Sequence, residues 1–336
     1  MQFDFTEPQT EFESLFGGSF LINIHGYISP GDDEKFLSFL RSVDPPPRTP
    51  VYIDSAGGNV EAAIEIGRLI RDHWFATHVG LYILDPNKPV DFFAPRKFIK
   101  GVCASAATLI YLGGKLRYMD PDSKFGVHRF SFKNPTPDDI GKSQILSSRI
   151  ARYVSDMGVG PEFLELSSST DHTSIDFVSH DKLRQLNVVT GGETPVEWTV
   201  QSRNNFLYVR GERDSLYGHH KMMIGYNKHS GYHLHAVIES QGRERELCEF
   251  PLVECLIGFG DEDAVDVSRR VERNVVGIYT NVFMRITREE ALKLSRADGV
   301  GLRIRAAADA PMFLGIAPMS VKGSEDLLRS FIENTG

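Results

Sequence analysis

Cysteine and tryptophan are scarce in this 336-residue sequence, which has three and two of them. The cysteines, Cys103, Cys248 and Cys255, are odd in number. Their spacings fit neither a disulfide framework nor a zinc site. We therefore expect reduced structural thiols, of the kind found in cytoplasmic proteins. No metal site is expected, because the histidines also lack metal-ligand spacing.

Long apolar runs and basic runs are also missing. No uninterrupted apolar stretch approaches the roughly 18–20 residues of a membrane helix, and the first residues, MQFDFTE, lack the basic and apolar regions of a signal peptide. We expect a cytoplasmic protein with no membrane span, or an exported one whose signal has been removed. The net charge is −8 and no run of five or more Lys or Arg occurs. Nucleic acid is therefore not expected as a partner.

The composition, 41% hydrophobic and 24% charged, is that of a globular protein long enough for two domains. In the first half, strands alternate with apolar-striped helices. The predicted strands are 20–28, 51–54, 77–84 and 98–104, and the predicted helices are 32–43, 60–72, 105–112 and 143–157. Short connections between alternating strands and helices predict an α/β domain with largely parallel strands.

The pattern of predicted elements changes after the segment GGETP at 191–195, from alternating strands and helices to mainly strands. Beyond it, the sequence predicts a hairpin that turns at 228–231, further strands, and a capping box at 287–290 that opens a helix. We therefore predict two domains, 1–192 and a β-rich α+β domain at 195–336. No catalytic signal is found in the second domain.

Ser105 stands where an apolar strand gives way to a helix of small residues. A serine becomes a nucleophile when a base can take its proton and fixed N–H groups can hold the oxyanion. A helix N-terminus favours negative charge at such a place. Taken alone, this pattern is more typical of a helix N-cap.

Two further segments add to it. The segment SAGGN at 55–59 follows a strand directly, and its adjacent glycines allow a close approach of backbone N–H groups to a substrate. His128 ends another short strand, 23 residues after Ser105. Each alone has an ordinary structural explanation, a tight turn or a core histidine.

The ordered set resembles the signature blocks of Clp-type serine proteases of the ClpP/crotonase fold. These blocks are IDSAGGNV at 53–60, GVCASAA at 101–107 and GVH at 126–128. The resemblance covers residues 18–190, and its later part is closer in texture to uncharacterised bacterial Clp-like proteins. It implies repeated β-β-α units and no cofactor.

The resemblance also implies roles. Ser105 would be the nucleophile and His128 the general base, and the amides of Gly58 and Ala106 would form the oxyanion hole. Gly57 and Asn59 would contact substrate, and a strand after Gly58 would pair with an extended peptide.

The acid of the triad departs from the pattern. The family has an Asp two residues before the Phe of a short strand, and this position is Ile175 here. Asp171, in the preceding loop, is the preferred candidate, with Asp176 as the alternative. A Ser–His dyad without an acid, or Lys133 or Lys142 as the base, are further readings. Cys103 is expected to be buried filler rather than a nucleophile.

The function expected from these features is a serine peptidase that acts on peptides or unfolded segments. The alternatives are an inactive Clp-fold scaffold and crotonase-type chemistry on acyl-coenzyme A. The resemblance implies a homo-oligomer assembled through the helix at 143–157. No docking loop for an ATP-dependent unfoldase can be recognised.

Overall fold

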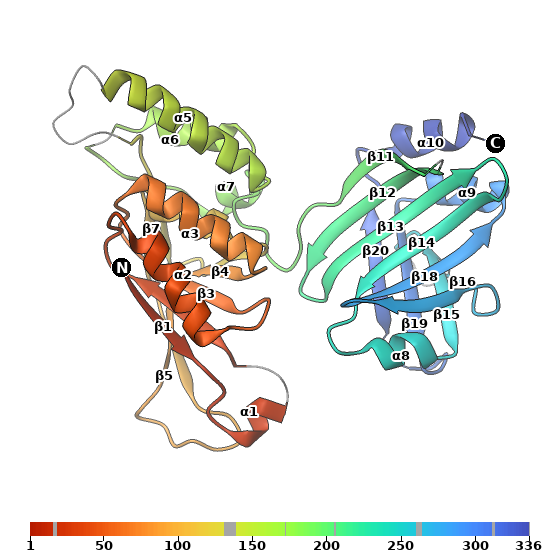
Figure 1. Ribbon diagram of the computed structural model, residues 1–336, viewed down its shortest axis with the longest axis horizontal. Helices are drawn as coiled ribbons and strands as arrows, with labels where there is room; N and C mark the ends of the chain where they lie inside the picture. Colours follow the sequence, from red (N-terminus) through yellow and green to blue (C-terminus); the bar gives the residue numbers. More distant parts are fainter. Residues whose placement is uncertain are drawn as a thin grey trace. The chain divides into compact units, whose positions relative to one another are not determined.

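The structure is a computed structural model, and it describes residues 1–15, 19–130, 139–171, 173–204, 206–259, 264–310 and 313–335 (Figure 1). The chain divides into two compact units, Met1–Gly192 and Glu193–Gly336. The division falls within the glycine-containing segment 191–195. Each unit has its own hydrophobic core.

A five-stranded sheet organises the first unit. Its strands, in spatial order, are β1 (Gln2–Thr6), β2 (Leu21–His25), β3 (Pro50–Asp54), β4 (Ala76–Val79) and β8 (Arg117–Met119). The pair β1–β2 is antiparallel and the other three pairs are parallel. The mixed α/β character predicted for this unit is therefore confirmed.

Helices α2 (Asp32–Val43) and α3 (Val60–Asp72) run side by side along this sheet (Figure 1). Their apolar stripes, with Phe36, Leu40 and Ile64, pack on the buried strand residues. They face the sheet together because apolar residues at helical spacing lie on one side of a helix.

A second sheet carries two of the three sequence blocks, those at 101–107 and 126–128, whereas the block at 53–60 lies between β3 and α3. It is a three-stranded sheet in the order β10 (Asp176–Phe177), β9 (Lys124–Val127) and β7 (Val102–Ala104). Strand β7 leads into helix α4 (Ala107–Leu112), whose residues are all buried. Strands β7 and β9 are parallel, so their carboxyl ends lie at the same edge.

Two predicted strands are each broken in two, which corrects the sequence-based prediction. The stretch 77–84 contains the end of β4 and the whole of β5 (Leu81–Leu84), separated by Gly80 with φ +125°. A Cβ at Gly80 would lie 2.5 Å from the carbonyl oxygen of Ile99. The stretch 98–104 likewise contains the end of β6 (Arg96–Ile99) and β7. The pair β5–β6 forms a separate hairpin because the chain leaves one sheet at Gly80 and enters another after Gly101.

Three more helices complete the unit: α5 (Asp139–Asp156), α6 (Glu162–Ser169) and α7 (His180–Gln185). The buried side chain of Arg117 joins the C-terminal ends of α4, α5 and α7. Its guanidinium donates hydrogen bonds to backbone carbonyls at Leu112, Gly114, Met157, Asn187 and Val188. The carbonyls at helix ends are otherwise unsatisfied, so a cation there is favourable. This fixes α5 relative to α4.

The second unit is antiparallel. One sheet has the order β11 (Glu197–Arg203), β12 (Phe206–Ser215), β13 (Gly218–Asn227), β14 (Gly231–Glu239), β18 (Tyr279–Ile286) and β17 (Glu272–Val276). The other has the order β16 (Ala264–Asp266), β15 (Leu252–Ile257), β19 (Gly299–Arg305) and β20 (Leu314–Ser320). Helices α8 (Glu244–Glu249), α9 (Arg288–Ser295) and α10 (Glu325–Glu333) pack on the same core.

Two local predictions for this unit are confirmed. The hairpin β13–β14 turns at 228–231, and Gly231 has the positive φ that such a turn requires. Thr287 and Glu290 form the capping box of α9. Within the described part of the chain, no helix is long and apolar enough to cross a membrane.

Candidate active site

Ser105 adopts a strained backbone conformation at the junction of β7 and α4. Its φ is +55°, in the left-handed region. Its amide donates to the carbonyl of Gly126, and its own carbonyl accepts from the amide of Thr108. A non-glycine residue held there costs about 1–3 kcal/mol and often marks a functional site. The sharp turn places Ser105 at the wall of a cavity, at the edge where β7 and β9 end.

The glycine turn lies directly against Ser105. Gly57 has φ +104°, and a Cβ there would lie 2.7 Å from Ser105 Cβ and 3.0 Å from the amide nitrogen of Ala106. Gly58 has φ +142°, and a Cβ there would lie 2.2 Å from the carbonyl oxygen of Ile28. Only glycine fits at either position. The fold therefore brings the first two sequence blocks into contact.

The two amides expected in the oxyanion hole remain available. Among the described residues, neither the Gly58 nor the Ala106 amide donates a hydrogen bond to a protein group. The neighbouring Gly57 amide is different, because it donates to the Ser55 hydroxyl at 3.1 Å. The Ser55 hydroxyl in turn donates to the Gly26 carbonyl at 2.7 Å. These bonds hold the turn and leave the Gly58 amide for a ligand.

The strand expected after Gly58 is absent, and the prediction that it pairs with a peptide is wrong. Helix α3 begins at Val60 instead, because Asn59 is its N-cap and accepts from the Ala62 amide at 2.8 Å. The Asn59 amide donates to the Ile28 carbonyl. The substrate-contact roles of Gly57 and Asn59 stay predictions; the structure gives both a structural role.

His128 follows β9 and lines the same cavity as Ser105. The ring is half-buried, and no hydrogen bond joins it to Ser105 within the described residues. Its Nδ1 atom is buried and has no hydrogen-bond partner there. Catalytic hydrogen bonds often tighten only when substrate binds. Ser105 and His128 thus line one cavity, and no hydrogen bond between them is present among the described residues.

The candidate acids lie elsewhere. Asp171 is half-exposed, and its Oδ2 accepts from Arg129 Nη2 at 2.9 Å. Its Oδ1 accepts from the amide and the hydroxyl of Thr173. Asp176 lies in β10 opposite Val127, one position away from His128. Among the hydrogen bonds of the described residues, none joins either carboxylate to His128, so their role as the acid stays a prediction.

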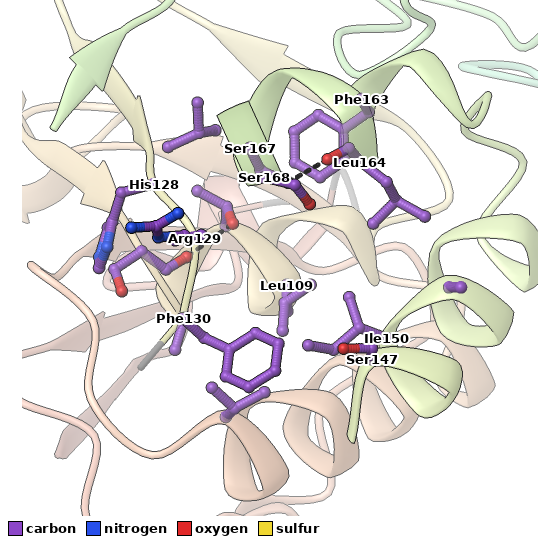
Figure 2. Close-up of a pocket in the computed structure, with 16 residues that line it drawn as sticks. Leu109, His128, Arg129, Phe130, Ser147, Ile150, Phe163, Leu164, Ser167 and Ser168 are labelled. Atoms are coloured by element: carbon purple, nitrogen blue, oxygen red, sulfur yellow. Dashed lines mark hydrogen bonds between the residues drawn. The ribbon is translucent and has the colours of Figure 1, made fainter. Parts of the chain in front are cut away.

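The cavity beside Ser105 has a volume of about 310 Å³ (Figure 2). Its apolar wall comes from three helices, with Leu109 of α4, Ile150 of α5, and Phe163 and Leu164 of α6. Hydroxyl-bearing side chains also border it: Ser147, Ser167, Ser168 and Thr108. Sequence reasoning missed these residues, because nothing local shows that α5 and α6 face Ser105.

A neighbouring cavity of about 500 Å³ lies on the other side of Val60 and Phe130, which line both. It includes Gly58 and Lys142. Lys142 thus lines the same cavity as Gly58 and does not line the Ser105 cavity. The alternative base Lys133 lies outside the described residues.

Cys103 is fully buried, and burial raises the pKa of its thiol well above the usual range. A thiol that does not ionise is a poor nucleophile. Its place two residues before Ser105 is therefore a packing position.

No family model matches the chain, and no curated protein matches it. A search of solved structures finds ClpP1 from Listeria monocytogenes, 20% identical, with a TM-score of 0.36. The match covers 50% of this chain and 87% of that one. A single-residue mutant of that protein matches at 21% identity with the same TM-score and coverage.

Proposed function

We propose that residues 1–192 are a Clp-like serine hydrolase domain of the ClpP/crotonase fold with repeated β-β-α units. Ser105 is its nucleophile and His128 its general base. Its substrates are peptides or unfolded protein segments. The observation that carries the proposal is the strained Ser105, held against the glycine turn beside two unbonded amides.

The chemistry follows from this geometry. His128 Nε2 takes the Ser105 proton as Oγ attacks the substrate carbonyl, and the oxyanion is held by the amides of Gly58 and Ala106. The protonated imidazole then gives its proton to the leaving amine, which leaves an acyl group on Ser105. A water molecule repeats the cycle and frees the acid.

The cavity favours an apolar substrate side chain next to the attacked carbonyl. Its wall is formed by Leu109, Ile150, Phe163 and Leu164. Among the described lining residues there is no Asp or Glu. Burial of an apolar side chain contributes about 25 cal/mol per Å². The missing carboxylate also disfavours crotonase-type acyl-coenzyme A chemistry, which commonly uses a Glu as acid and base.

Hydrolysis of a fluorogenic peptide with Leu or Phe at the cleaved position tests the proposal. Ser105→Ala and His128→Ala should each lower kcat at least about 10³-fold. Ser148→Ala is the matched control, because Ser148 is an exposed serine of α5 outside the cavity lining. Equal rates in wild type, Ser105→Ala and Ser148→Ala would contradict the proposal.

A second candidate is an inactive Clp-fold scaffold. It is favoured by two absences among the described residues: no hydrogen bond joins Ser105 to His128, and no carboxylate is bonded to His128. The scaffold predicts no hydrolysis by the folded wild type, so the same experiment separates the two. In either case we propose a homo-oligomer, with the second unit in an accessory role.

A further inference from the structure

The pairing of β9 with β10 identifies the residue beside His128. These strands are antiparallel, with Phe177 opposite Gly126 and Asp176 opposite Val127. The paired residues end there, because the Arg129 amide donates to the Thr170 carbonyl instead of continuing the pairing. An extension of the register by one position would bring Ile175 opposite His128. Residues two apart on a strand share a face, so this extension puts Ile175 and His128 on the face of Gly126.

Contacts at Gly126 support this placement. A Cβ on Gly126 would lie 2.5 Å from Ile175 Cγ2 and 3.0 Å from Phe177 Cε1. Both side chains therefore lean over the face that Gly126 and His128 share. Asp176 points to the opposite face, which removes it from His128 although it is next in sequence.

The His128 ring thus lies on the strand face over which the alkyl group of Ile175 leans. Its Nδ1 is buried without an acceptor among the described residues. The nearby carboxylate of Asp171 is bonded to Arg129 and Thr173. An imidazolium formed on His128 would have no negative partner at Nδ1.

Resting on the proposed function, we propose that Ile175 occupies the place of the triad acid and limits the hydrolysis of amides relative to esters and thioesters. Attack on either substrate transfers the Ser105 proton to His128. An amide nitrogen must then receive this proton as its C–N bond breaks, so both steps pass through the unsupported imidazolium. An activated alkoxide or thiolate can leave as the anion, so its breakdown step does not need the imidazolium.

The test compares wild type with Ile175→Asp on an anilide and a p-nitrophenyl ester of the same apolar acyl group. In a complete triad, replacing the acid by its amide lowers kcat about 10⁴-fold. Even a partly effective carboxylate at position 175 should therefore change the rate measurably. We expect Ile175→Asp to raise kcat/KM on the anilide at least about tenfold and on the ester less than about threefold.

Ile175→Asn is the matched control, because it has the shape of Asp without its charge. It should give no gain on the anilide. The pH–rate midpoint should rise in Ile175→Asp and not in Ile175→Asn, since a carboxylate raises the pKa of an adjacent imidazole. The other charged groups on these strands and beside the ring, Lys124, Arg129, Asp171 and Asp176, are unchanged in both variants.

Ile175 is 43% exposed, so a carboxylate there should be tolerated, and Ile175→Glu is a second variant if Asp disturbs folding. No anilide gain in folded variants that still hydrolyse the ester would overturn the inference. A decrease of more than about a hundredfold in kcat/KM on the anilide in Asp171→Asn would also overturn the inference, because the wild type would then already have its acid in Asp171. Absence of Ser105-dependent hydrolysis of both substrates would instead refute the proposed function on which the inference rests.

Discussion

At the scale of single residues, the site depends on backbone positions that tolerate no alternative. Ser105 is held at φ +55°, and the glycine turn fills the space beside it without a side chain. The surrounding structure must hold Ser105 there, because it would otherwise relax to a more common conformation. The close approach of Gly57 to Ser105 leaves no room for a side chain at position 57.

Gly57→Ala should lower kcat at least about a hundredfold, because its methyl group would displace Ser105 and the Ala106 amide, and a small misplacement of catalytic groups is costly. Gly31→Ala is the control, since Gly31 also has a positive φ, +85°, but has no atom within 4 Å of the new methyl. Steady-state kinetics on the peptide substrate measures both. An equal decrease of kcat in Gly57→Ala and Gly31→Ala would indicate backbone strain alone. It would contradict the explanation that the methyl group at position 57 displaces Ser105.

At the scale of elements, Asn59 can be a helix cap, a substrate contact or both. Asn59→Ala should lower the free energy of unfolding by about 1 kcal/mol, because the Ala62 amide loses its acceptor. Asn59→Asp should keep that stability, since Asp also caps helices. Urea unfolding and kcat/KM are measured together. A cap role alone predicts that activity follows stability, whereas lost activity in a fully stable Asn59→Asp would indicate substrate contact.

Helix α1 (Glu11–Leu15) is joined to the β5–β6 hairpin by a buried ion pair. The hydrogen bond from Arg96 is the largest cause that lowers the pKa of Glu13, to about 2 from 4.5. Because the folded-state pKa is below the unfolded value, the stabilisation is complete above pH 4.5 and is lost as the pH falls through about 2.

Glu13→Gln should therefore flatten the loss of stability of the first unit between pH 4.5 and 2. It should also lower stability at neutral pH, since Arg96 would be left buried without its anion. Urea unfolding at a series of pH values measures this. An unchanged pH slope in Glu13→Gln would show that this ion pair does not control acid stability.

Much of this organisation could be predicted from the sequence, where the cause is local. The apolar stripes of α2 and α3, the turn of β13–β14 and the cap of α9 all follow from neighbouring residues. The sequence does not predict β1, β11, β12 and β20. The residues of β1 and β11 are mostly exposed or half-buried, β12 contains a glycine and buried charged residues, and β20 contains a glycine and a proline. The sequence leaves the acid of the proposed triad open between Asp171 and Asp176, because the pairing of β10 with β9, which sets Asp176 opposite Val127, is not a local feature.

At the scale of the whole molecule, the two units have cores that share no residue. Leu302→Ala should therefore destabilise the second unit by about 2–5 kcal/mol, since Leu302 is buried in its core. Hydrolysis by the first unit should persist at temperatures where the variant's second unit has unfolded. Scanning calorimetry combined with activity measurements tests this. Simultaneous loss of activity and of the second unit would show that the first unit depends on the second.

The most direct test of the central claim is covalent labelling of the intact protein with a fluorophosphonate, read by mass spectrometry. We predict one adduct, located on the peptide that contains Ser105. It should be absent in Ser105→Ala, strongly reduced in His128→Ala and unchanged in Ser148→Ala. No adduct on the folded wild type between about pH 6 and 9, or an adduct on another serine, would contradict the account.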